Sequence, residues 1–361
     1  MARHFTARAL AAVAGAALAL GATAAQAQDK LSIRLGSGHP MQAVEYTLAA
    51  HNFLVPELIK RAKAAGVDLS VQELHGGTVA KLTEVFEATR DGLLDFGLWA
   101  FAFEPTDAFL QSFNFYLPFN SPDPMKVTQA TRATFDKFPE MAKVYEEKHN
   151  QKLLGVTCVG NYGLGTSFDW DKVEELKGKK IAGAGANLNW IVGATPVASN
   201  LNEAYNAIQS GVYNGYIIFP GSWYSFKLHE VGKHFMKTDF GAMAIMAASV
   251  NLDTWNKMSP ELQQIFMDTV KDYEVETAKL CSEFSVKGEK QLLDAGVSVK
   301  QLSDGEKTAW CEQLKDWPNN MAQEAVGRGL PAPDVMAFYM KSIQDLGHKF
   351  PCEYQITGAS N

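Results

Sequence analysis

The stretch from Glu174 to Pro220 constrains the fold more than any other part of the chain. A basic and then apolar run at 179–181 predicts a short strand, and Asn187 and Asn202 can each cap a helix after it. A β-type run at 212–219 then predicts a second strand. A strand, crossover helices and another strand make a parallel α/β unit, and sheets of this kind bind ligands beyond the carboxyl ends of their strands.

Other apolar runs extend this sheet, and the segments between them have helical spacing. Strands are predicted at 31–35, 67–74, 94–99 and 152–159, and helices at 44–65 and 79–91. Ser259 can cap a helix that Pro260 begins, and no proline interrupts the chain from there to Asp316. One long helix is therefore predicted at 261–290, with two more helices closing the chain.

Two motifs follow each other in the first stretch, E-L-K-G-K-K-I at 175–181 and L-N-E-A-Y-N-A-I-Q-S-G-V-Y-N-G at 201–215. Together they resemble the solute-binding proteins of TRAP transporters (tripartite ATP-independent periplasmic transporters) of the DctP type. G-L-L-D-F-G at 92–97 and M-S-P-E at 258–261 are similar to that family as well. The resemblance implies an α/β, two-lobed periplasmic-binding-protein (Venus-flytrap) fold with a long helix spanning both lobes. It also implies a small organic solute as ligand and TRAP membrane permease subunits as partners.

The chain departs from the family pattern at the ligand site. The resemblance implies an arginine just after the K-I pair, where it clamps a substrate carboxylate, but this chain has Ala182. Asn214 stands where the family usually has an acidic residue before the late glycine. A carboxylate is best held by a bidentate arginine. We therefore expect a ligand other than a simple arginine-clamped carboxylate.

Length and charge agree with a soluble two-lobed protein. A chain of 361 residues can bury two cores, and a formal net charge of −7 disfavours nucleic acid and anionic membranes as partners. The predicted division is a signal peptide at 1–27, lobe I at 28–150 and 239–260, lobe II at 151–238 and 276–345, the connecting helix at 261–290, and a C-terminal tail at 346–361.

The first 27 residues predict export. Arg3 and Arg8 supply a positive start, an alanine-rich apolar run follows at 9–22, and Ala25-Gln26-Ala27 is a small-x-small cleavage site. A retained membrane anchor is the alternative interpretation, but the run is rich in alanine and glycine and ends in that site. We expect a periplasmic mature chain with no inserted segment.

Four cysteines occur in this exported chain, at positions 158, 281, 311 and 352. They have no C-x-x-C spacing and no neighbouring histidine, so a zinc site is not predicted. Cys158 lies in a strand-like run and is expected to be a buried thiol. Among the three late cysteines a Cys311–Cys352 bridge is the favoured pairing, although spacing alone leaves the others open.

Polar and aromatic residues gather where the predicted strands end, and these are the candidate ligand contacts. They are His39, Glu73, Trp99, Phe101, Glu104, Tyr162, Trp190, Asn214, Tyr216, Phe219 and Trp223. Each aromatic residue could instead belong to the core, and each histidine could be a satisfied loop residue. Two ligand classes fit this set. An amine or neutral polar solute in an aromatic cage, helped by Glu73 or Glu104, is favoured over an aromatic compound stacked on tryptophan.

No motif of an enzyme or a cofactor is present in the sequence. G-x-S-x-G and H-E-x-x-H are absent, and the isolated G-A-G at 183–185 has neither dinucleotide nor Walker spacing. A secreted enzyme using Glu73 and Glu104 as an acid/base pair is an alternative whose spacing carries no specificity. A binding protein for an ABC-type importer or a sensor is the closer alternative. The expectation is a binding protein that is not an enzyme and has no cofactor.

Overall fold

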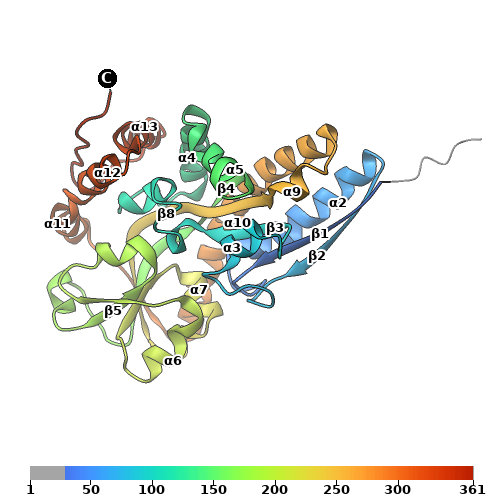
Figure 1. The fold of residues 1–361 in the computed structure, drawn as a ribbon. Helices are drawn as coiled ribbons and strands as arrows, with labels where there is room; N and C mark the ends of the chain where they lie inside the picture. The colour runs from blue at the N-terminus through green and yellow to red at the C-terminus, as the bar shows by residue number, and fades with distance from the viewer. Residues whose placement is uncertain (1–28, 361) are drawn as a thin grey trace, which may run out of the picture.

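The computed structural model describes residues 29–360, so the predicted signal peptide lies outside the described residues. The chain forms a mixed nine-stranded sheet in the order β2-β1-β3-β8-β4-β7-β5-β6, with β9 paired to β8 (Figure 1). The strands are β1 (Asp29–Ser37), β2 (Val67–Leu74), β3 (Phe96–Ala100), β4 (Gln151–Thr166), β5 (Lys180–Gly183), β6 (Thr195–Ala198), β7 (Gly215–Ile218), β8 (His234–Asn251) and β9 (Ser298–Gln301).

Two long antiparallel strands, β4 and β8, connect the two halves of the molecule. Near its C-terminal end β8 pairs with β3, which continues into the parallel strands β1 and β2. Near its own C-terminal end β4 pairs with β7, which continues into the parallel strands β5 and β6. Figure 1 shows β1 and β2 below one end of the long β8 ribbon and β5 below the other. The α/β architecture with two lobes is therefore confirmed, whereas the residue boundaries of the lobes stay a prediction.

Helices cover both groups of strands. Before β4 the helices are α1 (Glu45–Ala49), η1 (Ala50–Leu54), α2 (Val55–Ala64), α3 (Val85–Arg90), η2 (Phe101–Phe103), η3 (Leu110–Tyr116), α4 (Pro124–Lys137) and α5 (Glu140–Lys148). After β4 the chain adds η4 (Val173–Leu176), η5 (Gly185–Trp190), η6 (Leu201–Glu203), α6 (Ala204–Gln209), α7 (Pro220–Ser225), α8 (Leu228–Val231), α9 (Leu252–Trp255), α10 (Pro260–Asp294), α11 (Asp304–Leu314), α12 (Trp317–Gly327) and α13 (Ala332–Asp345). None of the helices in residues 29–360 combines the length and the apolar character needed to cross a bilayer.

The predicted long helix is α10, which has 35 residues. The Ser259 hydroxyl accepts a hydrogen bond from the Leu262 amide and caps its N-terminus, as expected. The helix continues through Gly288, where α7 approaches so closely that a Cβ would lie 2.4 Å from the Gly221 Cα. Gly288 therefore allows two helices to touch rather than ending one of them.

Two expectations about helices were wrong. The helix predicted at 79–91 is helical only over Val85–Arg90, and residues before it form turns. The cause is packing, because the Leu82 backbone lies against Gly38, where a Cβ would be 2.2 Å from the Leu82 Cα. Three helices rather than two follow β9, because the helical segment is interrupted between α11 and α12.

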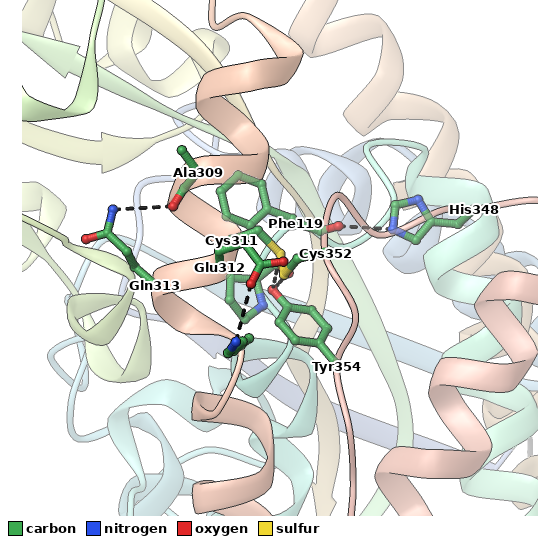
Figure 2. Close-up of a disulfide and its surroundings, with 10 residues drawn as sticks. Phe119, Ala309, Cys311, Glu312, Gln313, His348, Cys352 and Tyr354 are labelled. Atoms are coloured by element: carbon green, nitrogen blue, oxygen red, sulfur yellow. Dashed lines mark hydrogen bonds and ion pairs between the residues drawn. A yellow bond between two sulfur atoms is a disulfide. The ribbon is translucent and has the colours of Figure 1, made fainter.

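The C-terminal tail is attached by the predicted disulfide between Cys311 and Cys352, which is confirmed (Figure 2). The Tyr354 hydroxyl donates to the Pro118 carbonyl at 2.8 Å and holds the tail against η3's far end. Cys158 is a buried free thiol, as predicted, and Cys281 is a second one, with 3.7 Å between the two sulfur atoms.

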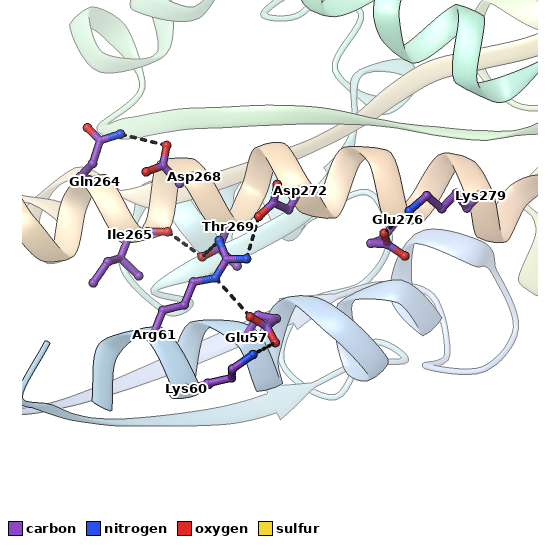
Figure 3. Close-up of polar contacts among 10 residues, drawn as sticks. All are labelled: Glu57, Lys60, Arg61, Gln264, Ile265, Asp268, Thr269, Asp272, Glu276 and Lys279. Atoms are coloured by element: carbon purple, nitrogen blue, oxygen red, sulfur yellow. Dashed lines mark hydrogen bonds and ion pairs between the residues drawn. The ribbon is translucent and has the colours of Figure 1, made fainter. Parts of the chain in front are cut away.

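Polar contacts attach α10 to both sides of the first half. Arg61 of α2 donates to Asp272 Oδ2 at 2.7 Å and also binds Glu57 (Figure 3). On another face, Glu274 accepts hydrogen bonds from the Arg132 guanidinium of α4 and from the Val156 amide of β4. The Glu274 side chain is only 6% exposed, so this ion pair joins three elements inside the protein.

Replacing Glu274 with glutamine leaves the Arg132 guanidinium without its anionic partner. We expect the free energy of unfolding to fall by about 3 kcal/mol, because an uncompensated buried charge is costly. Urea denaturation of the mature chain measures this. The control is Glu276→Gln on the same helix, which removes the Glu276–Lys279 surface pair and should cost less than about 0.5 kcal/mol. Equal losses in the two variants would contradict the role given to the buried pair.

Candidate ligand-binding site

A cavity of about 60 Å³ lies where the strands of the two halves end. β1 and β3 lead to it from one side, and β7 and η5 from the other. It is lined by His39, Val44, Tyr46, Leu82, Ala100, Ala102, Phe103, Phe115, Val159, Tyr162, Ala184, Asn187, Leu201, Tyr216, Ile217, Ile218, Phe219, Ile245 and Met246. The expectation that ligand contacts gather beyond the carboxyl ends of the strands agrees with this position.

The lining carries no charged side chain. None of the described residues around the cavity is Asp, Glu, Lys or Arg, and most of the wall is aliphatic or aromatic. Polar groups come from one histidine, one asparagine and three tyrosines. The cavity therefore offers hydrogen bonds in a largely apolar surround, and it offers no counter-ion to a charged ligand.

His39 supplies the polar group on the side of β1. Its Nδ1 lies 3.0 Å from the Tyr46 hydroxyl, and burial lowers the pKa of His39 to about 4, so the ring is neutral at pH 7. A neutral imidazole has one donor and one acceptor nitrogen. If the Tyr46 O–H donates to Nδ1, the proton of His39 is on Nε2, which is then a donor. We assign this tautomer because it gives the Tyr46 hydroxyl an acceptor.

Two further polar atoms of the lining, Asn187 Oδ1 and the Tyr162 hydroxyl, have no hydrogen-bond partner among the described residues. Asn187 in η5 is 2% exposed, and its Oδ1 has no hydrogen-bond partner there. The Tyr162 hydroxyl on β4 makes no hydrogen bond within residues 29–360, whereas Tyr216 donates to the Ser199 carbonyl at 3.1 Å. His39, Asn187 and Tyr162 come from three different segments and are the groups free to contact a solute.

A buried carboxyl group lies behind the cavity wall. Glu45 opens α1 between the lining residues Val44 and Tyr46, and it is fully buried. Neither of its carboxyl oxygens has a hydrogen-bond partner within the described residues. A Cβ on Gly160 would lie 3.0 Å from Glu45 Oε1, so the carboxyl group packs against β4. Desolvation raises the pKa of Glu45 to about 8, and the group is mostly protonated at neutral pH.

Four of the eleven residues predicted from the sequence line the cavity together. They are His39, Tyr162, Tyr216 and Phe219. The three predicted tryptophans lie outside it, with their indole N–H groups used internally. Trp99 donates to Ser249 Oγ, Trp190 to the Phe115 carbonyl and Trp223 to the Gly232 carbonyl. Phe101 is also outside the lining and stacks with Tyr145 in the core.

The predicted polar residues Glu73, Glu104 and Asn214 lie outside the cavity as well. Glu73 pairs with His51 and His75. Glu104 lies near Glu87 and Asp107, and its pKa is raised to about 8, first by burial and then by these acidic neighbours. Asn214 Oδ1 accepts the Lys180 amide proton at 3.0 Å and holds β5 beside the β7 turn.

Sequence reasoning missed some lining residues, chiefly Asn187 and Tyr46. Asn187 was predicted only as a helix cap, which is wrong because it lies inside η5. It follows the carboxyl end of β5, and that position should have marked it. Tyr46 lies inside a predicted helix, and no spacing rule shows which face of that helix meets the cavity.

Comparisons with known proteins point to one family. Residues 57–324 match the family described as bacterial extracellular solute-binding protein, family 7 (DctP). The ectoine-binding periplasmic protein TeaA of Halomonas elongata is 26% identical over 292 residues, which cover 77% of this chain and 82% of TeaA.

Solved structures of similar proteins show the same fold. A TRAP solute-binding protein from a marine metagenome, specific for aromatic acid ligands and crystallised with 3-hydroxybenzoate, has a TM-score of 0.77 and 20% identity, covering 89% of this chain and all of that one. A Bordetella pertussis extracytoplasmic solute receptor that binds pyroglutamic acid has a TM-score of 0.74 and 18% identity, covering 87% and 100%.

The buried Glu45 predicts a pH dependence of stability. Its pKa is about 4.5 when unfolded and about 8 when folded, so the folded chain holds a proton that the unfolded chain releases. Stability contributed in this way is lost as pH rises from 4.5 to 8, at up to about 1.4 kcal/mol per pH unit. The glutamine in Glu45→Gln cannot ionise, so the variant should lose less stability than the wild type between pH 5 and pH 8. Its melting temperature should therefore fall less over this range than that of the wild type.

Melting curves of both proteins from pH 5 to 8 provide the test, with Glu57→Gln as control. Glu57 is a surface carboxylate of α2 paired with Lys60 and Arg61, and its removal should leave the slope unchanged. A wild-type slope that persists in Glu45→Gln would contradict the assignment.

Proposed function

The chain belongs to family 7 of the bacterial extracellular solute-binding proteins, and we propose that it captures one small, uncharged solute by lobe closure and delivers it to a TRAP membrane permease. It is a TRAP-type solute-binding receptor, and the family's members are binding proteins. Periplasmic location follows from the family and from the predicted signal peptide, and the permease partnership from the family. The absence of any enzymatic activity belongs to the same proposal.

The uncharged lining of the cavity is the observation that carries the ligand class. An ionised group moved from water into an apolar site costs several kcal/mol unless a counter-ion meets it. A carboxylate would lack its arginine, since Ala182 is fully buried in β5. An amine would lack an ionised acid, since Glu73 and Glu104 lie outside the lining and the Glu45 carboxyl behind the wall is mostly protonated at neutral pH. Of the two solutes expected in an aromatic cage, we therefore propose the neutral one and not the amine.

The shape and polarity of the wall narrow this class further. Phe103, Phe115 and Phe219 give flat apolar surfaces that suit an aromatic or similarly flat solute. The His39 Nε2–H group, in the assigned tautomer, calls for an acceptor such as a carbonyl oxygen. The marine relative binds aromatic acids, which supports a flat ligand.

Lobe closure follows from where the three free polar groups come from. His39 follows β1, Asn187 follows β5, and Tyr162 lies on β4 between the two halves. A solute bonded to all three would stabilise the arrangement in which both halves meet around it. This is the hinge-type closure expected of a two-lobed receptor.

Three ring compounds of nearly equal size test the ligand class: benzamide, benzoate and benzylamine. Refolded mature chain, free of carried-over ligand, should be stabilised by benzamide and much less by the two ions. A compound at about 100 times its dissociation constant adds about 2.7 kcal/mol, which a thermal-shift assay detects readily. 3-Hydroxybenzoate, pyroglutamate and ectoine complete the panel because relatives bind them. A larger shift with benzoate or benzylamine than with benzamide would overturn the proposal.

A pair of neighbouring asparagines locates the site. Asn187→Ala should weaken benzamide binding about tenfold, because a buried hydrogen bond of about 1.4 kcal/mol is lost. Asn189→Ala is the matched control, since Asn189 is exposed on the same η5 segment and bonds only the Ala186 carbonyl within the described residues. Isothermal titration calorimetry measures both dissociation constants. Equal effects in the two variants would place the site elsewhere.

A further inference from the structure

Glu73 does not touch the cavity, but a line of short contacts connects it to His39. Glu73 Oε2 lies 3.1 Å from His75 Nε2, and His75 Nδ1 lies 2.8 Å from Ser37 Oγ. Ser37 Oγ in turn lies 3.0 Å from the His39 carbonyl oxygen, which also accepts the Gly76 amide proton. Ser37 is 1% exposed and the His75 side chain 5% exposed. The line therefore runs inside the protein and ends on the backbone of a cavity residue.

Counting protons shows that this line is incomplete when His75 is neutral. The three contacts from Glu73 to His39 each need one proton. A neutral imidazole contributes one proton and the Ser37 hydroxyl contributes one, so two protons serve three contacts. With the proton on Nδ1, the Glu73 contact would be the one left without a proton. The Glu73 carboxylate favours the proton on Nε2, and the Ser37 hydroxyl must then choose between His75 Nδ1 and the His39 carbonyl. With an imidazolium, all three hydrogen bonds form at once. His75 donates to Glu73 and to Ser37, and the Ser37 hydroxyl donates to the His39 carbonyl.

Charged and titratable neighbours decide when the third proton arrives. Glu73 of β2 faces His75, and its negative charge favours the imidazolium. His51 of η1 contacts the same carboxylate at 2.9 Å, and its proximity lowers the pKa of His75. Burial is the largest effect and lowers the pKa of His75 below its usual value of 6.5. The third proton is therefore added only below the ordinary pH range of histidine titration.

We propose that Glu73, His75 and Ser37 form a positioning chain for His39, in which an added proton completes the hydrogen bonds and fixes the His39 carbonyl. None of the three needs to contact a solute. They act by holding the turn that carries His39, so the solute-binding part of this inference rests on the proposed function. Mild acid then strengthens binding of a solute that His39 contacts.

Nuclear magnetic resonance of the ligand-free protein tests the chain directly. The chain is labelled with ¹⁵N and ¹³C, and the His75 ring nitrogens and the His39 carbonyl carbon are followed from pH 8 to pH 5. We expect both to change with one midpoint below pH 6.5. In Ser37→Ala, the His75 ring should still titrate while the His39 carbonyl no longer follows. The proposal would be overturned if the His39 carbonyl signal did not change with the His75 titration in the wild type, or if it changed with it equally in Ser37→Ala.

Glu73→Gln provides a second variant that keeps the size of the side chain. Without the carboxylate charge, the shared midpoint of His75 and His39 should fall by about one pH unit. Glu57→Gln, which removes a surface carboxylate on α2, should leave the midpoint in place. A merely structural role for Glu73 would change the melting temperature without moving the two midpoints together. An unmoved midpoint in Glu73→Gln would overturn the proposal.

A binding measurement carries the inference to function. The dissociation constant of benzamide should be about three to ten times lower at pH 5.5 than at pH 7.5 in the wild type, and equal at the two values in Ser37→Ala. No binding of benzamide at either pH would contradict the proposed ligand class, while the magnetic resonance result still decides the positioning chain. Equal affinity at both pH values in the wild type would contradict the link between chain and binding.

Discussion

The antiparallel pairing of β4 with β8 is the constraint on which the rest of the structure depends. It is the part of the sheet that both halves share, and its register shifts between Val159 and Leu164, near the cavity. Opposite this irregular part, Asp239 and Gly241 of β8 have φ values of 54° and 106°. Asn161 stabilises the bend, donating to Asp239 Oδ1 at 2.8 Å and accepting the Gly241 amide proton. The sheet thus changes direction at the level where the solute would lie.

The arginines of the described residues form ion pairs outside the cavity lining. Arg61, Arg132 and Arg328 pair with acidic side chains of their own surroundings, and Arg34 pairs with Asp95 near the end of β8. Under the proposed function, the solute would face a small set of neutral donors and acceptors on an apolar wall. Such a site rejects a wrong ligand because that ligand leaves a buried polar group of the site without a hydrogen-bond partner. The free-energy cost of that loss is larger than the cost of losing a methylene contact.

Patterns within short stretches of the sequence predicted the features that depend on neighbouring residues, such as helix caps and strands. The capped start of α10, the parallel pairing of β5 with β7, and the positions of His39 after β1 and Phe219 after β7 follow from spacing and capping. Tyr162 was expected just after a strand at 152–159, but β4 continues to Thr166 and carries it. Which aromatic face turns inward is a tertiary property, so Trp99, Trp190 and Trp223 were indistinguishable from cavity residues. The pairing of Glu73 with His51 spans 22 residues and depends on how η1 packs beside β2. The sequence gives no sign of the contact between Gly288 and Gly221, because the two residues lie far apart in the chain.

The same burial that removes charge from the cavity also limits the pH range over which it stays neutral. His39 takes up a proton only near pH 4, because an imidazolium there would be desolvated. Glu45, behind the wall on the next helix, loses its proton only near pH 8 for the same reason. Protonating the first or ionising the second would place an unpaired charge within a few residues of the solute. Between these limits the lining groups stay neutral, so a solute of the proposed class would meet neutral groups alone, and an ionic ligand would have to bring its own counter-charge.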